Sequence, residues 1–376
     1  MRYSCAFLLA ACLHVAGQDS GWLSSSPPPL PETFRWRRLN FSGYVDTFYD
    51  LNYNHPASGA SQLQAFNLTA DKWSLASATA TVSVDPSPVG FRLDAGAGRV
   101  YDAFWLSEPS HTGWSRHLLN AYVSFKPASW RGVQVDFGKF VTSAGAEVTE
   151  SHLNWNYSRS LLFAFGPYYH TGLRATVPAG NRWTLGAAVV TGWNTVRDNN
   201  SGKTLGFTST GNLGKVQIAN TWYAGPEHTG TNKGWRNFYD SLVTVTPADR
   251  VSMYFNFDIG NQRMAAAPSA TFWGVAGAAR IRLAKNIALS PRFEHYSDRD
   301  GFWTGQPNRF REFTLTAESR LNDCLISRLE IRKDWSRHPW FERGPGEGLR
   351  HHQMMLVAGI MVVLKPGLLT FPGPGK

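Results

Sequence analysis

One pattern recurs from residue 41 to residue 364: runs of about ten residues in which apolar and polar side chains alternate. In the run 41–51, Val45 and Tyr49 fall on one face, while Asp46 and Asp50 fall on the other. Such alternation indicates β-strands, because successive side chains of a strand point to opposite faces of a sheet. The expected strands, about sixteen in number, cover 41–52, 72–84, 88–100, 116–126, 131–140, 168–178, 182–193, 203–212, 215–224, 237–247, 250–260, 270–283, 286–297, 310–320, 325–335 and 352–364.

The connections between these runs alternate in length. Short turns fall at 85–87, 127–130, 179–181, 213–214, 247–249, 284–285 and 321–323. Longer connections fall at 53–71, 101–115, 141–167, 194–202, 225–236, 261–269, 298–309 and 336–351. A soluble β-sandwich has no reason to sort its connections in this way, whereas barrels of the bacterial outer membrane have short turns on one side and long loops on the other. The even strand count places both ends of the barrel on the short-turn side.

The hydropathy of the chain fits strands, rather than helices, in lipid. Mean hydropathy is −0.28, and the best apolar run, 354–364, is shorter than the roughly 20 residues that a spanning helix needs. Lipid leaves no water for unpaired backbone groups, so spanning strands must close into a barrel. We therefore expect an all-β fold, a transmembrane antiparallel up-and-down β-barrel of about sixteen strands in the bacterial outer membrane.

The polar face of the strands carries many charges, for example Arg328, Glu330 and Arg332. An arginine on the lipid face would cost about 2–4 kcal/mol at the midplane. We therefore expect the charges to face inward. A barrel of this size has an interior that side chains do not fill, which predicts an aqueous channel lined by these charges.

The formal net charge of +10 is spread along the chain rather than gathered in one cluster. We therefore expect no nucleic-acid partner. A basic pore lining and contacts with outer-membrane lipid and anionic lipopolysaccharide are the expected roles, and ordinary solvated surface charge is the alternative. Cys5 and Cys12 lie in the N-terminal leader, which leaves Cys324 alone. We expect no disulfide, metal, cofactor or catalytic site, and we interpret His351 and His352 as a pair at a loop end.

The two ends of the chain differ from the barrel. Residues 1–17 resemble a secretory signal peptide, with Arg2 before a short apolar core and the small residues Val15 and Gly17 before the expected cleavage point. A lipoprotein signal ending at Cys12 is the alternative. Residues 18–40 are expected to form a linker rich in proline and serine, residues 41–365 the barrel, and residues 366–376 a C-terminal tail.

Aromatic residues fall near the ends of the expected strands. They are Phe48, Tyr49, Trp73, Trp130, Phe140, Trp183, Trp193, Trp222, Tyr223, Trp235, Tyr239, Trp273, Trp335 and Trp340. Aromatic rings at both ends of membrane strands form girdles at the two interfaces. The alternative interpretation is an ordinary aromatic core or a glycan-binding surface.

Five segments occur in an order that resembles a known family. They are FSGYVD at 41–46, VGFRLD at 89–94, VQVDFGKF at 133–140, NYSRS at 156–160 and YHTG at 169–172. Together they resemble the bacterial outer-membrane porins of the OmpL-like β-barrel class, over most of the chain after the leader. The resemblance implies a pore. The chain departs from the usual barrel ending, a terminal Phe, because Pro-Gly-Pro-Gly-Lys follows Phe371, so Leu364 or Phe371 would have to serve as the assembly signal.

The third long connection, 141–167, is the longest. Sixteen-stranded porins fold their third loop into the lumen, and that resemblance implies a constriction formed by Glu147, Glu150, His152 and Arg159. The facing cations on the wall would include Arg92, Arg174, Arg282, Arg292 and Arg332. Charges across a narrow gap select ions by sign, so the net charge favours a mild anion preference. A solvated external loop is the alternative.

Three functions fit the sequence. The first is a non-enzymatic porin, a water-filled channel through which small polar solutes or ions diffuse. The second is a plugged outer-membrane barrel with a structural or binding role, and the third is a secreted β protein that binds glycans through its tryptophans. Sixteen-stranded porins are often trimers, so a homotrimer is the expected assembly.

Overall fold

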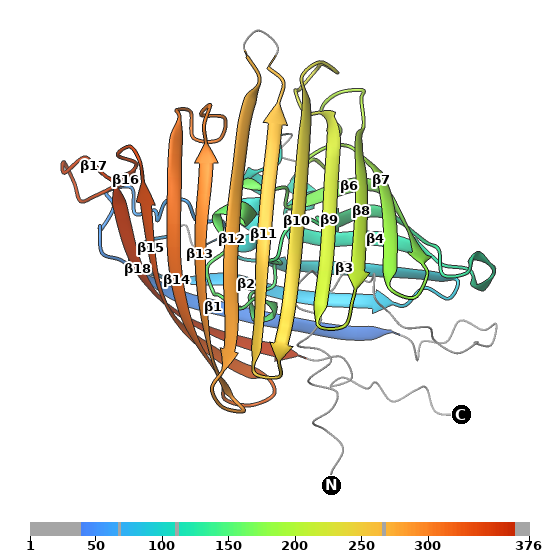
Figure 1. Cartoon of the computed structure of the whole chain (residues 1–376), viewed down its shortest axis with the longest axis horizontal. Helices are drawn as coiled ribbons and strands as arrows, with labels where there is room; N and C mark the ends of the chain where they lie inside the picture. Colours follow the sequence, from blue (N-terminus) through green and yellow to red (C-terminus); the bar gives the residue numbers. More distant parts are fainter. Residues whose placement is uncertain (1–38, 67–68, 110–112, 265–267, 365–376) are drawn as a thin grey trace.

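The computed structural model describes residues 39–66, 69–109, 113–264 and 268–364. Sixteen strands of this part of the chain pair antiparallel into one closed barrel (Figure 1). They are β1 (Asn40–Asn52), β2 (Lys72–Val84), β3 (Val89–Ala97), β4 (Leu118–Phe125), β5 (Gln134–Val141), β6 (Tyr169–Ala179), β7 (Trp183–Val190), β8 (Thr204–Asn212), β9 (Val216–Pro226), β10 (Trp235–Ala248), β11 (Val251–Gln262), β12 (Ala270–Arg282), β13 (Ile287–Asp298), β14 (Asn308–Arg320), β15 (Leu325–Ser336) and β18 (His352–Leu364). The predicted all-β barrel is confirmed.

The first and last strands close the barrel. β1 pairs with β2 on one side and with β18 on the other, so the sheet has no open edge. Gly43 lies opposite Leu364, so β1 begins and β18 ends at the same rim. The short connections lie at this rim, which we call the short-turn rim, and the opposite one is the long-loop rim. Both ends of the barrel therefore lie at the short-turn rim, as predicted.

Side chains alternate between the inner and outer faces as the sequence predicts. Along β14 every second side chain is buried, including Glu312 and Thr316, and the intervening Phe313 and Leu315 are exposed. The inner face is rich in charged and hydroxyl side chains, and the outer face is mainly apolar. This arrangement suits a barrel surrounded by lipid, because the polar groups are kept away from the hydrocarbon.

The structure departs from the predicted strands mainly at the long-loop rim. β3 ends at Ala97, and the helix α2 (Arg99–Leu106) begins where the strand was expected to run to 100, followed by the short helix η2 (Gly113–His117). Phe104 of α2 stacks on Tyr168 and Tyr169, with ring centres 5.3 and 5.4 Å away. The last long connection contains an unpredicted hairpin of β16 (Phe341–Glu342) and β17 (Leu349–Arg350). Among the described residues, no helix is long and apolar enough to cross a membrane.

The expected aromatic girdles are partly correct. Exposed outward-facing rings lie near the long-loop rim, among them Trp73, Trp222, Trp235, Tyr239 and Trp335, and near the short-turn rim, where Trp130 and Trp183 lie. The prediction is wrong for Phe48, Phe140, Trp193, Tyr223 and Trp340, which are buried in the interior or pack against its aromatic cluster. A position near a strand end does not by itself tell whether a ring faces lipid.

The predictions for the chain ends fall largely outside the described residues. The signal peptide at 1–17, residues 18–38 of the linker and the tail at 366–376 all lie there. The barrel strands run from Asn40 to Leu364.

Candidate functional site

The connection between β5 and β6, residues 142–168, folds into the barrel, and we call it the inner loop. It contains the short helices η4 (Ser151–Leu153) and α3 (Leu161–Phe165). Tyr157 and Ser158 donate their backbone N–H groups to the carboxylate of Glu330 on β15, at 2.6 and 2.9 Å. The hydroxyl of Tyr157 donates to Asp46 on β1 at 2.7 Å. The loop is therefore bonded to inward-facing side chains of the wall.

Tyr157 lies against the wall at a glycine. A Cβ atom built on Gly359 of β18 would come 2.3 Å from the ring of Tyr157. Only a residue without a side chain allows the loop to approach the strand so closely. The glycine thus fixes how near the inner loop can lie to this part of the wall.

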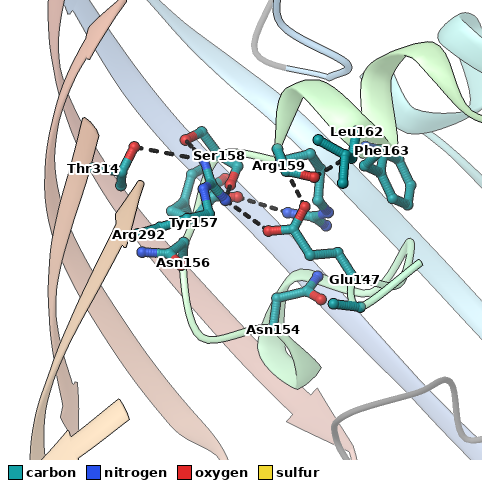
Figure 2. Close-up of polar contacts among 12 residues, drawn as sticks. Glu147, Asn154, Asn156, Tyr157, Ser158, Arg159, Leu162, Phe163, Arg292 and Thr314 are labelled. Atoms are coloured by element: carbon teal, nitrogen blue, oxygen red, sulfur yellow. Dashed lines mark hydrogen bonds and ion pairs between the residues drawn. The ribbon is translucent and has the colours of Figure 1, made fainter. Parts of the chain in front are cut away.

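Arg292 of β13 is the centre of a buried ionic cluster with three carboxylates, and Figure 2 shows its contacts with Glu147 and Ser158 of the inner loop. Its guanidinium lies 2.6 Å from Glu147 of the inner loop, 2.9 Å from Glu312 and 3.0 Å from Glu294. It also donates to the carbonyl oxygen of Ser158 at 2.8 Å. The side chains of Arg292, Glu294 and Glu312 have no exposed surface. Because a buried charge without a partner is costly, this cluster strongly favours one position of the loop.

Arg159 stabilises the loop from within. Its guanidinium donates to the backbone carbonyls of Val148 and Thr149, at 2.9 and 2.7 Å, and to that of Tyr157 at 2.6 Å, a contact that Figure 2 shows. Arg332 of β15, paired with Asp334 at 2.9 Å, donates to the carbonyl of Arg159 at 2.6 Å. Of the predicted site residues, the wall residue Arg332 thus binds the backbone of the loop residue Arg159.

Arg328 of β15 is a loop-binding residue absent from the predicted site. It donates to the carbonyls of Ser151 and Asn156, at 2.7 and 3.0 Å, and pairs with Glu318 at 2.7 Å. Its place on the polar face of the strand was evident from the alternation. Its contact with the loop could not be read from the sequence, because nothing local relates β15 to residues 151–156.

The remaining predicted wall residues lie between mid-barrel and the short-turn rim, and they differ in exposure. Arg92 of β3 is 25% exposed and lies 3.8 Å from Glu150 of the inner loop, which is 17% exposed. Arg174 of β6 pairs with Asp136 of β5 at 2.8 Å. Arg282, at the end of β12, donates to the carbonyl of Asp249 in the turn before β11.

His152 of the inner loop carries no charge near neutral pH. Burial, followed by the nearby cations Arg328, Arg320 and Arg159, lowers its pKa to about 3. The ring instead lies 4.9 Å from that of Tyr44. His152 therefore packs against Tyr44 as a neutral ring and adds no charge to the site.

A third arginine group lies at the short-turn side of the inner loop. Glu318 of β14 forms ion pairs with Arg280 at 2.5 Å, Arg320 at 3.0 Å and Arg328 at 2.7 Å. Arg280 and Arg320 remain 22% and 35% exposed, whereas Glu318 is 2% exposed. Cationic groups therefore dominate the solvent-accessible surface of this cluster.

In the described part of the chain, no group of histidine, cysteine and acidic side chains is suited to hold a metal ion.

The closed barrel with an inner loop can now be compared with known proteins. A family model described as "Putative beta-barrel porin-2, OmpL-like" matches residues 38–364. The chain belongs to this porin family. The predicted family resemblance is therefore confirmed, and the porin is a protein of the bacterial outer membrane. A search of curated proteins found no match.

Solved structures with a similar fold include porins and other outer-membrane proteins. The anion-selective porin from Comamonas acidovorans is 10% identical, with 87% of this chain and 99% of that chain covered and a TM-score of 0.59. OmpT of Vibrio cholerae is 10% identical, with 86% and 97% covered and a TM-score of 0.56. Its in-vitro folded trimer form is 10% identical, with 86% and 98% covered and a TM-score of 0.57. At this identity the likeness concerns the fold.

Proposed function

We propose that the porin is a non-enzymatic channel for passive diffusion of small polar solutes and ions, with a mild preference for anions. The observation that carries the proposal is the arginine cluster around Glu318, in which three cations share one buried carboxylate. An excess of one charge sign along a confined aqueous path attracts ions of the other sign and repels its own. The selectivity in the name of the Comamonas porin agrees with this proposal.

The inner loop acts in this proposal as the constriction. Arg92 and Glu150 lie on its accessible side, and the cluster of Arg292 holds its other side to the wall. Because the loop is fixed by the buried ion pair of Glu147 with Arg292 and by hydrogen bonds to Arg328 and Glu330, the narrow part of the path keeps its dimensions. Small solutes would pass along the accessible side, and larger ones would be excluded.

The preference for anions can be measured as a reversal potential in a potassium chloride gradient across a planar bilayer. We expect the sign that indicates chloride preference. The double variant Arg280→Gln/Arg320→Gln should shift the potential toward cation preference, because it removes the two most accessible cations of the cluster. Arg343→Gln, in the exposed last loop, removes one charge far from this cluster and is the control. Cation preference of the unmodified protein would refute the proposed selectivity.

A plugged barrel with a binding or structural role is the second candidate. It is favoured by the complete burial of Arg292, Glu294, Glu312 and Arg332, because charges that line a water-filled path would normally be hydrated. The same bilayer experiment separates the two. Folded, heat-modifiable protein that inserts and carries no current would favour the plug over the channel.

We also propose that the porin assembles as a homotrimer. On the outer face at mid-barrel, Asn220 of β9 donates to Ser209 of β8 at 3.2 Å and accepts from Ser241 of β10 at 3.0 Å. Polar side chains are disfavoured against hydrocarbon, so cover by another copy would stabilise this face. The trimer form of the Vibrio protein agrees with the idea. Native mass spectrometry of the detergent-solubilised protein should give three times the chain mass, and a purely monomeric protein would contradict the proposal.

A further inference from the structure

A group of cations on the outer face lies apart from the lumen. Arg309 and Arg311 occupy alternate positions of β14 near the long-loop rim, and both are exposed. Arg311 is paired across the sheet with Trp335 of β15, and Phe313 is paired with Lys333. Inward-facing residues alternate with all of these, so the three cations share the face of the barrel that meets lipid.

These cations differ from the arginines inside the barrel. The wall arginines that bind the inner loop, Arg292, Arg328 and Arg332, each pair with a carboxylate. In the part of the chain that the structure describes, no salt bridge joins Arg309, Arg311 or Lys333 to an acidic residue. Their charges are thus available to an anion outside the protein.

The surface next to the cations changes in character toward the middle of the barrel. Phe313 is 41% exposed on β14, and Phe293 is 53% exposed on the neighbouring β13. Leu315 and Ile331 continue this apolar face on β14 and β15. Nearer the rim, Lys333 lies 5.2 Å from the ring centre of Trp335. An interfacial tryptophan and a basic side chain mark the depth of the head groups, and the apolar side chains mark the acyl chains.

We propose that Arg309, Arg311 and Lys333 form a binding site for the phosphate groups of lipid A, the glycolipid anchor of lipopolysaccharide. The long-loop rim of an outer-membrane barrel faces the outside, so the cations stand at the level of the outer-leaflet head groups. Lipid A has anionic phosphates at the membrane surface and several acyl chains below them. The patch likewise has its cations near the rim and its apolar side chains toward the middle of the barrel. The arginine guanidinium is well suited to phosphate, which it can bind by two parallel hydrogen bonds.

Other occupants fit this surface less well. A transported solute would not meet it, because it faces away from the lumen. A second copy of the chain docked through the same patch would bring two sets of cations together. A lipid with a phosphorylated head group neutralises the charge and covers the apolar side chains at the same time, so the charge complementarity favours lipid A.

The site can be tested by native mass spectrometry of the refolded full chain in detergent with added bisphosphorylated lipid A. We expect the unmodified porin to retain lipid A, and Arg309→Gln/Arg311→Gln to bind it about tenfold more weakly or worse. Arg309→Lys/Arg311→Lys keeps the charge and should retain most of the binding. The control is Arg343→Gln/Arg350→Gln, which removes two exposed cations paired with Glu347 in the last loop, and it should bind lipid A like the unmodified protein.

Three results would overturn the site. The first is equal lipid A binding by Arg309→Gln/Arg311→Gln in protein whose heat-modifiable migration shows that it is folded. The second is an equal loss in Arg343→Gln/Arg350→Gln, and the third is equal retention of lipid A from which both phosphates have been removed. Channel current is a separate readout. The lipid site can therefore be refuted without refuting the channel, and the channel can be refuted without refuting the lipid site.

Discussion

The side chain of Arg292 has no exposed surface, although it stands on the polar face of β13. Three carboxylates and a backbone carbonyl surround it, and one of these carboxylates, Glu147, comes from the inner loop. A buried ionic cluster adds little net stability compared with apolar packing, but removing one member leaves the others unpaired. Arg292 therefore determines where the loop lies more than it strengthens the barrel.

Replacing Arg292 tests this role. We expect Arg292→Met to lower the free energy of unfolding by about 3–5 kcal/mol, because Glu147, Glu294 and Glu312 lose their shared cation in a buried setting. Urea unfolding in lipid vesicles, followed by tryptophan fluorescence, measures the change. Arg299→Met, at a side chain that is 77% exposed, is the control and should change it little. Equal stability of Arg292→Met and the unmodified porin would contradict the claim that the three buried carboxylates depend on Arg292.

At the scale of single residues, the sequence predicted which side chains face the barrel interior, but not which of them are buried from water. The alternation placed Arg92, Arg174, Arg292 and Arg332 on inward-facing positions, because parity along a strand is a local property. Whether an inward charge meets water depends on the path of the inner loop across the barrel. That path brings Glu147 to Arg292, 145 positions away in the sequence, and no local pattern encodes such a contact.

The inner loop is held mainly through its backbone. Arg328 binds three of its carbonyl groups, those of Ser151, Asn154 and Asn156, and Glu330 binds two of its amides. Such contacts depend on the shape of the loop rather than on the side chains at those loop positions. The wall residues Arg328 and Glu330 should therefore control the mobility of the loop more than most changes within it.

A pair of arginine variants separates loop attachment from charge. Arg328→Gln should increase both mean conductance and current noise, because the bonds to Ser151 and Asn156 are lost. Arg320→Gln is the matched control, since Arg320 shares Glu318 with Arg328 and, within the described part of the chain, forms no hydrogen bond with the inner loop. It should alter ion preference with little added noise. Indistinguishable noise in the two variants, recorded at the same voltage and salt, would argue against attachment through Arg328.

At the scale of elements, the barrel strands could be predicted to within a few residues because alternation and short turns are local signals. The helix α2 and the hairpin of β16 and β17 could not be predicted. α2 is held by stacking of Phe104 on Tyr168 and Tyr169, which belong to the end of the inner loop and the start of β6. Without a repeating apolar pattern, a short element that depends on tertiary contacts resembles ordinary loop sequence.

The whole molecule is asymmetric along the barrel axis. Toward the long-loop rim, aromatic side chains such as Phe272, Tyr296, Phe310 and Phe341 pack together inside the barrel. Toward the short-turn rim, arginines with partial exposure line the interior. The proposed channel thus has a cationic vestibule on the periplasmic side and a packed layer on the outer side, with the inner loop between them.

The most direct test of the channel is single-channel recording of the refolded porin in potassium chloride. The account predicts discrete steps of open conductance in the unmodified protein, and larger, noisier steps when the inner loop is released by Arg328→Gln. Heat-modifiable, inserted protein that stays silent in both forms would contradict the channel and leave the plugged barrel as the better description.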